Sequence, residues 1–317
     1  VRGTALHHAL RLIGGRIWVS EPSGMVADGH HLAISTGTVS AFHKGALLDM
    51  DAQGQAVAYG KLSASTLVQS LIQTESDSLQ ALETLGPTGF DVPKRLGDIA
   101  WGQERGFWQS GPDEEGPPWQ HGLSPALANG LGELFQQSRH EQTMETTAFW
   151  QDLVRWHEAA IPHLDTRWTE RMATLRARCE DDITEPMVVG RAHGDFIAWN
   201  VKGDEERVFL FDWEQSMADA PPFFDLLHWL VFTHCHIDGV SGPVWPLLER
   251  GGEYTRARAH LEVLLGLECT GLHLRLFALR SLCYHLQAWV PAYEANREQH
   301  AATLDVLWRV AEEAMAL

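Results

Sequence analysis

Three side chains that carry oxygen atoms follow one another closely in the second half of the chain. Asp195 and Asn200 lie in the stretch RAHGDFIAWNV, and Asp212 lies in VFLFDWE. Two carboxylates and an amide suit a hard cation that keeps some of its water and bridges phosphate oxygens, as Mg²⁺ does. A carboxylate that is left over can accept a proton from an attacking hydroxyl. The residue types therefore indicate metal-assisted chemistry on a hydroxyl group.

These side chains need a local structure that brings them together. The segment NVKGDEERVFLFDW predicts a β-hairpin with its turn at Gly203 and Asp204. A tight hairpin would place Asn200 and Asp212 at the same end of its two strands, with Asp195 on the loop just before. A surface hairpin with ordinary polar turn residues is the alternative.

The combined pattern resembles a known family. HGDFIAWN followed by LFDWE is similar to the signature of the aminoglycoside phosphotransferase and choline kinase group, which shares the protein-kinase-like fold. His193, Gly194, Asp195, Asn200 and Asp212 all match it. The resemblance implies that Asp195 is the catalytic base and that Asn200 and Asp212 hold the metal. It is close over residues 190–232 and looser over 36–111.

The segment APPFFDLLHW also resembles this family, which has an Asp at the start of the helix after the metal site. Asp225 takes that place, and the resemblance implies that it braces the catalytic loop rather than reacting. His193 is expected to organise the same loop by hydrogen bonding, because a histidine in this setting more often has a structural role than a chemical one.

The first third of the chain is then expected to supply an ammonium group for nucleotide phosphates and a carboxylate to hold it. Lys61 ends the strand AVAYGKL, and Glu75 lies four residues from both Leu71 and Leu79 in the next helix. A carboxylate on an apolar helix face is costly unless it is paired, so Lys61 is its natural partner. Alternatively, Glu75 lies at the margin of that face and reaches water. Lys44 competes with Lys61 but lacks the following helix.

Two weaker expectations concern the nucleotide. Residues 35–45, STGTVSAFHKG, fall between two strands where a phosphate-covering loop belongs, and backbone N–H groups near Thr38 and Ser40 could face phosphate. An ordinary hairpin loop is nearly as good an interpretation. The resemblance alone places the adenine near Gln109 and Gly111.

The elements divide the chain into a β-rich first third and a helical remainder, separated by the hinge-like GPDEEGPP. This predicts an α+β, two-lobed protein-kinase-like fold, with residues 1–111 as a nucleotide-binding lobe and 112–317 as a catalytic and substrate-binding lobe. The first long helix should bury a stripe formed by Leu67, Leu71, Leu79 and Leu82. Besides the hairpin, strands are expected at 16–20, 31–36, 44–50, 56–62 and 105–110, and helices at 63–86, 125–139, 146–160, 166–182, 222–235, 256–267, 272–290 and 298–316.

The formal net charge of -18 argues against nucleic acid and anionic membrane as partners. No apolar run is long enough to span a bilayer. Four cysteines without metal-binding spacing favour free thiols in a reducing compartment, so a cytoplasmic monomer or homodimer is expected. The acidity could suit a cationic amino sugar or amine alcohol, but a solvated acidic surface is the simpler interpretation.

Together these features predict a small-molecule kinase that uses ATP, or GTP, with Mg²⁺ to phosphorylate a substrate hydroxyl. A protein kinase is disfavoured because Gly194 replaces the Arg that reads a phosphorylated activation loop, and because only eight residues separate Asp212 from Pro221. A catalytically inactive nucleotide-binding or regulatory protein of the same fold is the remaining alternative.

Overall fold

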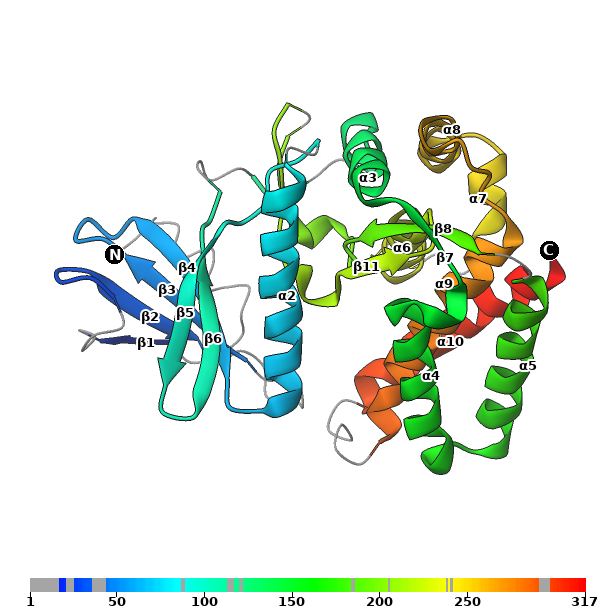
Figure 1. The fold of residues 1–317 in the computed structure, drawn as a ribbon, viewed down its shortest axis with the longest axis horizontal. Coiled ribbons are helices and arrows are strands. Elements are labelled where there is room, and N and C mark those ends of the chain that lie inside the picture. Colours follow the sequence, from blue (N-terminus) through cyan, green and yellow to red (C-terminus); the bar gives the residue numbers. More distant parts are fainter. Residues whose placement is uncertain are drawn as a thin grey trace. The chain divides into compact units, whose positions relative to one another are not determined.

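A computed structural model describes residues 17–20, 26–35, 44–86, 89–112, 117–119, 122–183, 186–204, 206–237, 239, 242–290 and 297–317. Thr38 and Ser40 lie outside the described residues. The chain forms two compact units (Figure 1). The first unit comprises Val1–Pro87, Asp91–Pro117 and Phe209–Gln215, and the second comprises Thr88–Phe90, Pro118–Val208 and Ser216–Leu317. The predicted α+β organisation, with a β-rich first unit and a mostly helical second unit, is confirmed.

A six-stranded antiparallel sheet forms the body of the first unit, in the order β1-β2-β3-β4-β6-β5. Its strands are β1 (Ile17–Ser20), β2 (His31–Ser35), β3 (Gly45–Met50), β4 (Ala56–Ser63), β5 (Arg95–Trp101) and β6 (Glu104–Gln109). The turn between β3 and β4 is a hairpin connection. Gly54 has a φ of 79°, and the Asp51 side chain accepts the N–H groups of Gln53 and Gln55. Strand β5 was not expected, because its residues alternate poorly between apolar and polar types.

Helix α2 (Thr66–Leu85) follows β4 and lies beside the sheet (Figure 1). Its buried face includes Val68, Ile72, Glu75, Leu79 and Leu82. The predicted stripe was therefore wrong in its first half: Leu67 and Leu71 are only half-buried. Val68 and Ile72 replace them, because the helix is rotated so that Glu75 lies at the middle of the buried face.

The second unit is mostly helical around a three-stranded sheet of order β11-β8-β7. Its strands are β7 (His140–Gln142), β8 (Met187–Ala192) and β11 (Met217–Ala220), and its long helices are α3 (Pro125–Ser138), α4 (Ala148–Ala160), α5 (Thr166–Asp182), α8 (Glu253–Leu265), α9 (Gly271–Leu286) and α10 (Arg297–Ala316). These helices match the expected ones within a few residues. The sheet was missed, since β7 is a polar tripeptide and gains its structure only by pairing with β8.

Shorter elements carry the predicted motif. The hairpin expected after Asn200 is present as β9 (Val201–Gly203) and β10 (Val208–Leu210), and its turn is closed by the Asp204 N–H, which donates to the Arg207 carbonyl. Short 3₁₀ turns precede and follow it, η3 (Ala198–Asn200) and η4 (Trp213–Gln215). Further 3₁₀ turns are η1 (Met144–Thr146), η2 (Ile161–His163) and η6 (Gln287–Trp289).

The helix expected over 222–235 is shorter than predicted. Helix α6 (Phe224–Val231) continues as a π-helical turn, η5 (Phe232–Ile237), before the short α7 (Trp245–Glu249). A π-helical turn widens the backbone by one residue and has no signature in hydrophobic periodicity. Every residue of α6 is buried, including Asp225 and His228.

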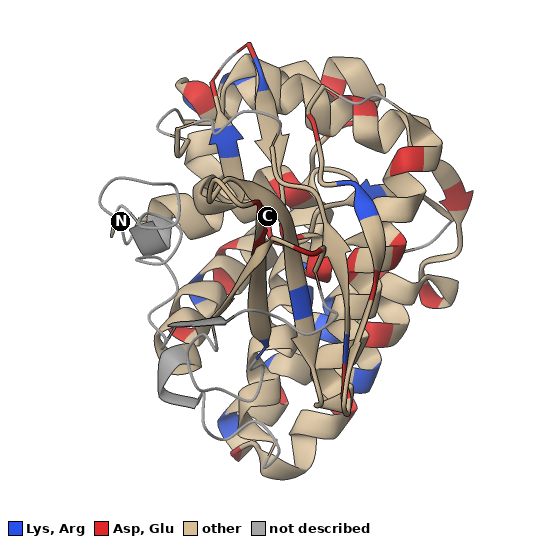
Figure 2. Ribbon diagram, turned by 90° about the vertical axis from the view of Figure 1, so that its left-hand side faces the viewer, with Lys and Arg blue, Asp and Glu red and all other residues tan. Residues whose placement is uncertain are grey.

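Acidic residues are distributed over both units, and three of the cysteines lie in the interior. Figure 2 shows Asp and Glu spread over many elements rather than gathered on one of them. Cys179, Cys269 and Cys283 are buried free thiols. Among the described residues, no helix combines the length and apolar content needed to cross a bilayer.

Candidate active site

An ion pair joins the strand and the helix that sequence patterns selected in the first unit. Lys61 on β4 donates through Nζ to both oxygens of Glu75 on α2, at 2.8 and 2.6 Å. Glu75 is fully buried, so the carboxylate depends on this partner for its solvation. The Lys61 ammonium also donates to Asp212 Oδ1 at 2.6 Å. The predicted pair of Lys61 and Glu75 is thus present, and Asp212 is a second carboxylate partner of the same ammonium group.

A second ammonium group lies at the same carboxylates. Lys44, directly before β3, is paired with Glu214, and its Nζ is 3.8 Å from Asp212 Oδ1. Sequence reasoning ranked Lys44 below Lys61 as an alternative, whereas the structure brings both together. It did not assign Glu214, although this residue lies only two positions after Asp212. Two ammonium groups therefore face three carboxylates.

The charges in this cluster set one another's protonation. Burial lowers the pKa of the Lys61 ammonium, but Asp212 and Glu75 raise it by more, so the net pKa lies above its usual value. Burial and Lys61 lower the pKa of the Lys44 ammonium, but Asp212 and Glu214 raise it by more, so its pKa also lies above the usual value. Burial raises the pKa of the Glu75 carboxyl, against the opposing effect of Lys61. Both lysines therefore remain cationic at neutral pH.

Asp212 lies at a backbone position that is sterically restricted. Its φ is 69°, in the left-handed region that Asp tolerates better than most residues. The following Trp213 is fully buried and donates its indole N–H to the Leu210 carbonyl at 3.0 Å, which anchors the turn. A strained conformation held by buried neighbours is often found at functional positions.

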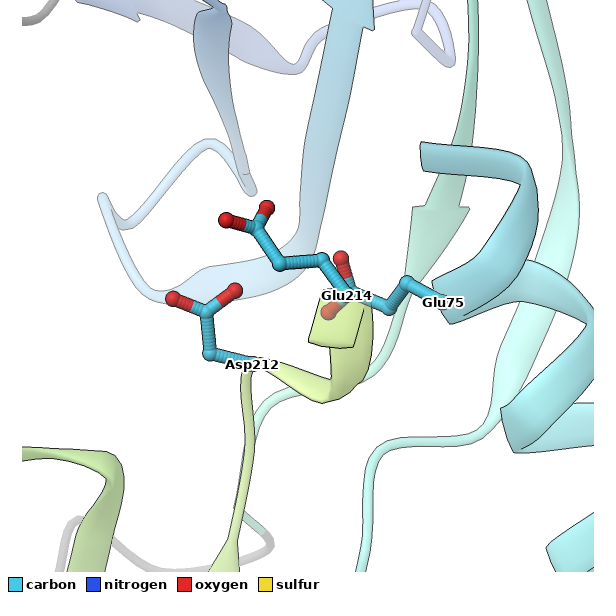
Figure 3. Close-up of side chains that lie close together, drawn as sticks. All are labelled: Glu75, Asp212 and Glu214. Atoms are coloured by element: carbon cyan, nitrogen blue, oxygen red, sulfur yellow. The ribbon is translucent and has the colours of Figure 1, made fainter. Parts of the chain in front are cut away.

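The same residues offer oxygen ligands for a cation. Carboxylate oxygens of Glu75, Asp212 and Glu214 lie within 4.8 Å of one another, and Figure 3 shows these side chains close together. Glu75 is fully buried, whereas Asp212 and Glu214 are partly exposed, which makes these two carboxylates the more accessible cation donors. Hard oxygen ligands of this kind fit Mg²⁺.

Asp225 forms hydrogen bonds to the HGD loop of the second unit, which contains His193, Gly194 and Asp195. The Asp225 carboxylate accepts the backbone N–H groups of His193 at 2.7 Å and Gly194 at 2.9 Å. Burial raises the pKa of this carboxyl to about 6, although the two N–H donors act in the opposite direction. Gly194 has a φ of 83°, which a residue with a Cβ rarely adopts. Asp225 therefore contacts the loop at the two backbone positions before Asp195, and the bracing role that the resemblance implies for it stays a prediction.

Asp195 is held by the residues around it in the loop. Its backbone N–H donates to His193 Nδ1 at 3.3 Å. Asn200 Nδ2 donates to the Asp195 carbonyl at 2.9 Å and to Asp195 Oδ2 at 3.1 Å. His193 is fully buried and Asn200 nearly so, whereas the Asp195 side chain is 29% exposed. The loop thus presents one carboxylate on a rigid support.

A further residue touches this loop and was not found from the sequence. His228 on α6 faces the Phe196 carbonyl through Nδ1 at 3.0 Å, and its Nε2 lies 3.6 Å from Asp195 Oδ1. The only available signal was its position three residues after Asp225, since residues so spaced share a helix face. Nothing in that spacing says which loop the face will meet.

The residues expected near adenine occupy the end of β6. Gln109 is buried opposite Tyr59 in the β4–β6 pairing, two residues along from the pair of Lys61 and Phe107. Within the described residues its Oε1 has no hydrogen-bond partner. At Gly111 a Cβ would crowd the Tyr59 ring, at 2.5 Å from its nearest carbon. Contact of these residues with a nucleotide stays a prediction.

Comparison with known proteins identifies the fold. No family model matches the chain, and no curated protein matches it. Among solved structures, a protein of Ralstonia eutropha JMP134, provisionally assigned as an aminoglycoside phosphotransferase, is 15% identical, with a TM-score of 0.57 and 98% of each chain covered. A variant of aminoglycoside phosphotransferase APH(4)-Ia, in ternary complex with ADP and hygromycin B, is 10% identical, with a TM-score of 0.54 and 98% of each chain covered.

The chain has the aminoglycoside phosphotransferase fold. The amicoumacin kinase hAmiN, solved with AMP-PNP and Ca²⁺, shares it at 12% identity and a TM-score of 0.51, over 98% of this chain and 94% of that one. In this phosphotransferase fold, Asp212 belongs to the first unit, and Asp195 and Asn200 belong to the second. The convergence of these three side chains stays a prediction.

Proposed function

We propose that the chain is a small-molecule kinase that transfers the γ-phosphoryl group of ATP, or GTP, to a substrate hydroxyl. The observation that carries the proposal is the buried pair of Lys61 and Glu75, with Asp212 on the same ammonium. A fully buried carboxylate costs stability unless it is compensated. Placing an ammonium for a polyphosphate is a function that explains why the fold keeps it.

Each residue then has one role. Lys61 positions the nucleotide phosphates, and Glu75 holds the ammonium in place. Asp195 orients the acceptor hydroxyl and takes its proton as the new phosphoester bond forms. Asn200 and Asp212 would hold Mg²⁺, which neutralises charge on the phosphates when bound. Thr38, Ser40, Gln109 and Gly111 are proposed nucleotide contacts.

Two other functions are less well supported. A protein kinase needs a long segment after Asp212 for its peptide substrate, and here η4 and β11 fill the interval up to Pro221. An inactive nucleotide-binding protein would have no use for a supported carboxylate at Asp195. The cytoplasmic location, and the monomeric or homodimeric state, remain proposals from composition.

A screen of candidate acceptors tests the proposed kinase activity and identifies the substrate class. ATP consumption with Mg²⁺ would be measured against hydroxylated metabolites, amine alcohols and aminoglycosides, with GTP as the second donor. The matched control is Asp195→Asn, which keeps the shape of the side chain and removes its basicity. We expect it to lower turnover by about 10³-fold or more, with nucleotide affinity changed little.

The outcomes separate the alternatives. Turnover that depends on the acceptor and disappears in Asp195→Asn supports the kinase. Nucleotide binding without turnover for any acceptor supports the inactive alternative. Turnover close to that of the unmodified protein in Asp195→Asn would show that Asp195 is not the base.

A further inference from the structure

Helix α6 supports the HGD loop at two points, one helical turn apart. The Asp225 carboxylate accepts hydrogen bonds from the N–H groups of His193 and Gly194. His228 contacts the carbonyl of Phe196, further along the loop. His228 is 5% exposed. Burial of an imidazole is costly unless both of its nitrogens are used, so each contact of this ring is informative.

The two ring nitrogens of His228 have different partners. Nδ1 lies 3.0 Å from the Phe196 carbonyl oxygen. A carbonyl only accepts, so the hydrogen must be on Nδ1. Nε2 lies 3.6 Å from Asp195 Oδ1, an ion-pair distance that is longer than a hydrogen bond. A bare lone pair on Nε2 would face a carboxylate and be repelled, whereas a proton on Nε2 makes the contact attractive.

Aromatic rings hold the imidazole in this orientation. Phe232 stacks on His228 with ring centroids 4.3 Å apart and an interplanar angle of 12°. Phe277 meets the ring edge-on at 6.2 Å, and Phe224 lies at 6.5 Å. Phe232 belongs to the π-helical turn, so the widened backbone there supplies the stacking partner. The Asp195 carboxylate lies at ion-pair distance from this ring.

We propose that His228 is a positioning residue for Asp195: as an imidazolium, it holds Oδ1 of the carboxylate through Nε2 while Asn200 holds Oδ2. This inference rests on the proposed role of Asp195 as base. With both oxygens restrained, the remaining lone pairs of the carboxylate have a defined direction toward an acceptor hydroxyl. The contact is expected to shorten when substrate closes the site, as such contacts commonly do.

Two substitutions separate positioning from packing. His228→Asn places an amide N–H near the position of Nδ1, so it keeps the bond to Phe196 and leaves Asp195 without its partner. His228→Gln places an amide N–H near the position of Nε2, so it keeps a donor toward Asp195 and loses the bond to Phe196. The two variants thus test opposite nitrogens of one ring.

We expect activity and stability to rank these variants in opposite orders. Both variants lose the ring on which Phe232 stacks, so both should melt earlier than the unmodified protein. His228→Asn should melt later than His228→Gln and lose roughly 10- to 100-fold in kcat, with KM for nucleotide and acceptor nearly unchanged. His228→Gln should melt earlier and keep kcat within about threefold. If kcat follows stability instead, so that His228→Asn is the more active variant, His228 only packs the helix.

A measurement without turnover keeps this inference separate from the proposed function. In protein labelled with ¹⁵N-histidine, the Nε2 resonance of His228 should show an imidazolium at neutral pH and shift in Asp195→Asn. An unchanged resonance refutes the contact even if the protein is an active kinase. A shifted resonance in a protein that phosphorylates no acceptor supports the contact and counts against the proposed function alone.

Discussion

Replacing Asp225 by Asn should change how stability depends on pH. The carboxyl is buried with two N–H donors, and its pKa lies at about 6 instead of 3.8. Between about pH 3.8 and about pH 6, the folded chain therefore binds a proton at this carboxyl more readily than the unfolded chain does. Stability from this group is therefore fully present below about pH 3.8 and is lost as the pH rises through about 6.

The magnitude follows from the size of the shift. A difference of about two pKa units corresponds to roughly 3 kcal/mol, at 1.36 kcal/mol per unit. Asn does not titrate, so the variant lacks this loss. Between pH 4 and pH 7.5 the unfolding free energy of the unmodified protein should fall by about 2.5 kcal/mol relative to Asp225→Asn, because part of the loss occurs below pH 4. At about 2–4 °C per kcal/mol, the thermal midpoints should diverge by roughly 5–10 °C.

Thermal unfolding of both proteins across this range gives the result directly, since the other carboxyl groups cancel in the difference. Asp181→Asn is a suitable control, because Asp181 is exposed on α5 and the substitution makes the same change in charge. This variant controls for the loss of one negative charge. A difference between Asp225→Asn and the unmodified protein that stays constant within about 0.5 kcal/mol would refute the reasoning, because Asp225 would then titrate alike in both states.

Three further outcomes follow from the first unit. Glu75→Gln keeps the shape but removes the charge that holds Lys61, so we expect a loss of roughly 1–3 kcal/mol in stability and weaker nucleotide binding, measured by thermal unfolding and calorimetric titration. Gly106→Ala should destabilise by more than about 2 kcal/mol, since its Cβ would meet the carbonyl oxygen of Lys61 on β4. Gly97→Ala on β5 is its control, because no atom lies within 4 Å of a Cβ there. Asp212→Asn should raise the Mg²⁺ concentration for half-maximal turnover about tenfold or more, and an unchanged Mg²⁺ dependence would remove Asp212 from the metal site.

Local sequence patterns were sufficient for the long helices and for most strands of the first sheet. Apolar residues recur at helical spacing, and a hairpin turn needs residues that tolerate positive φ, so each signal is contained in a few neighbouring positions. The strands β7, β8 and β11 gave no such signal. β7 has three residues and β11 has four, and both pair with β8, a contact that no window of sequence contains.

The candidate site divides in the same way. The sequence alone predicted the HGD loop and the hairpin after Asn200, because their residue spacing is a local signal. It also predicted the pairing of Lys61 with Glu75, because a carboxylate on an apolar helix face is costly unless it is paired. Only the folded structure revealed that Lys44 and Glu214 join that pair, and that His228 faces Asp195. Those contacts join residues that are far apart in the chain. The packing of helices and strands decides which side chains come into contact, and local sequence does not contain that information.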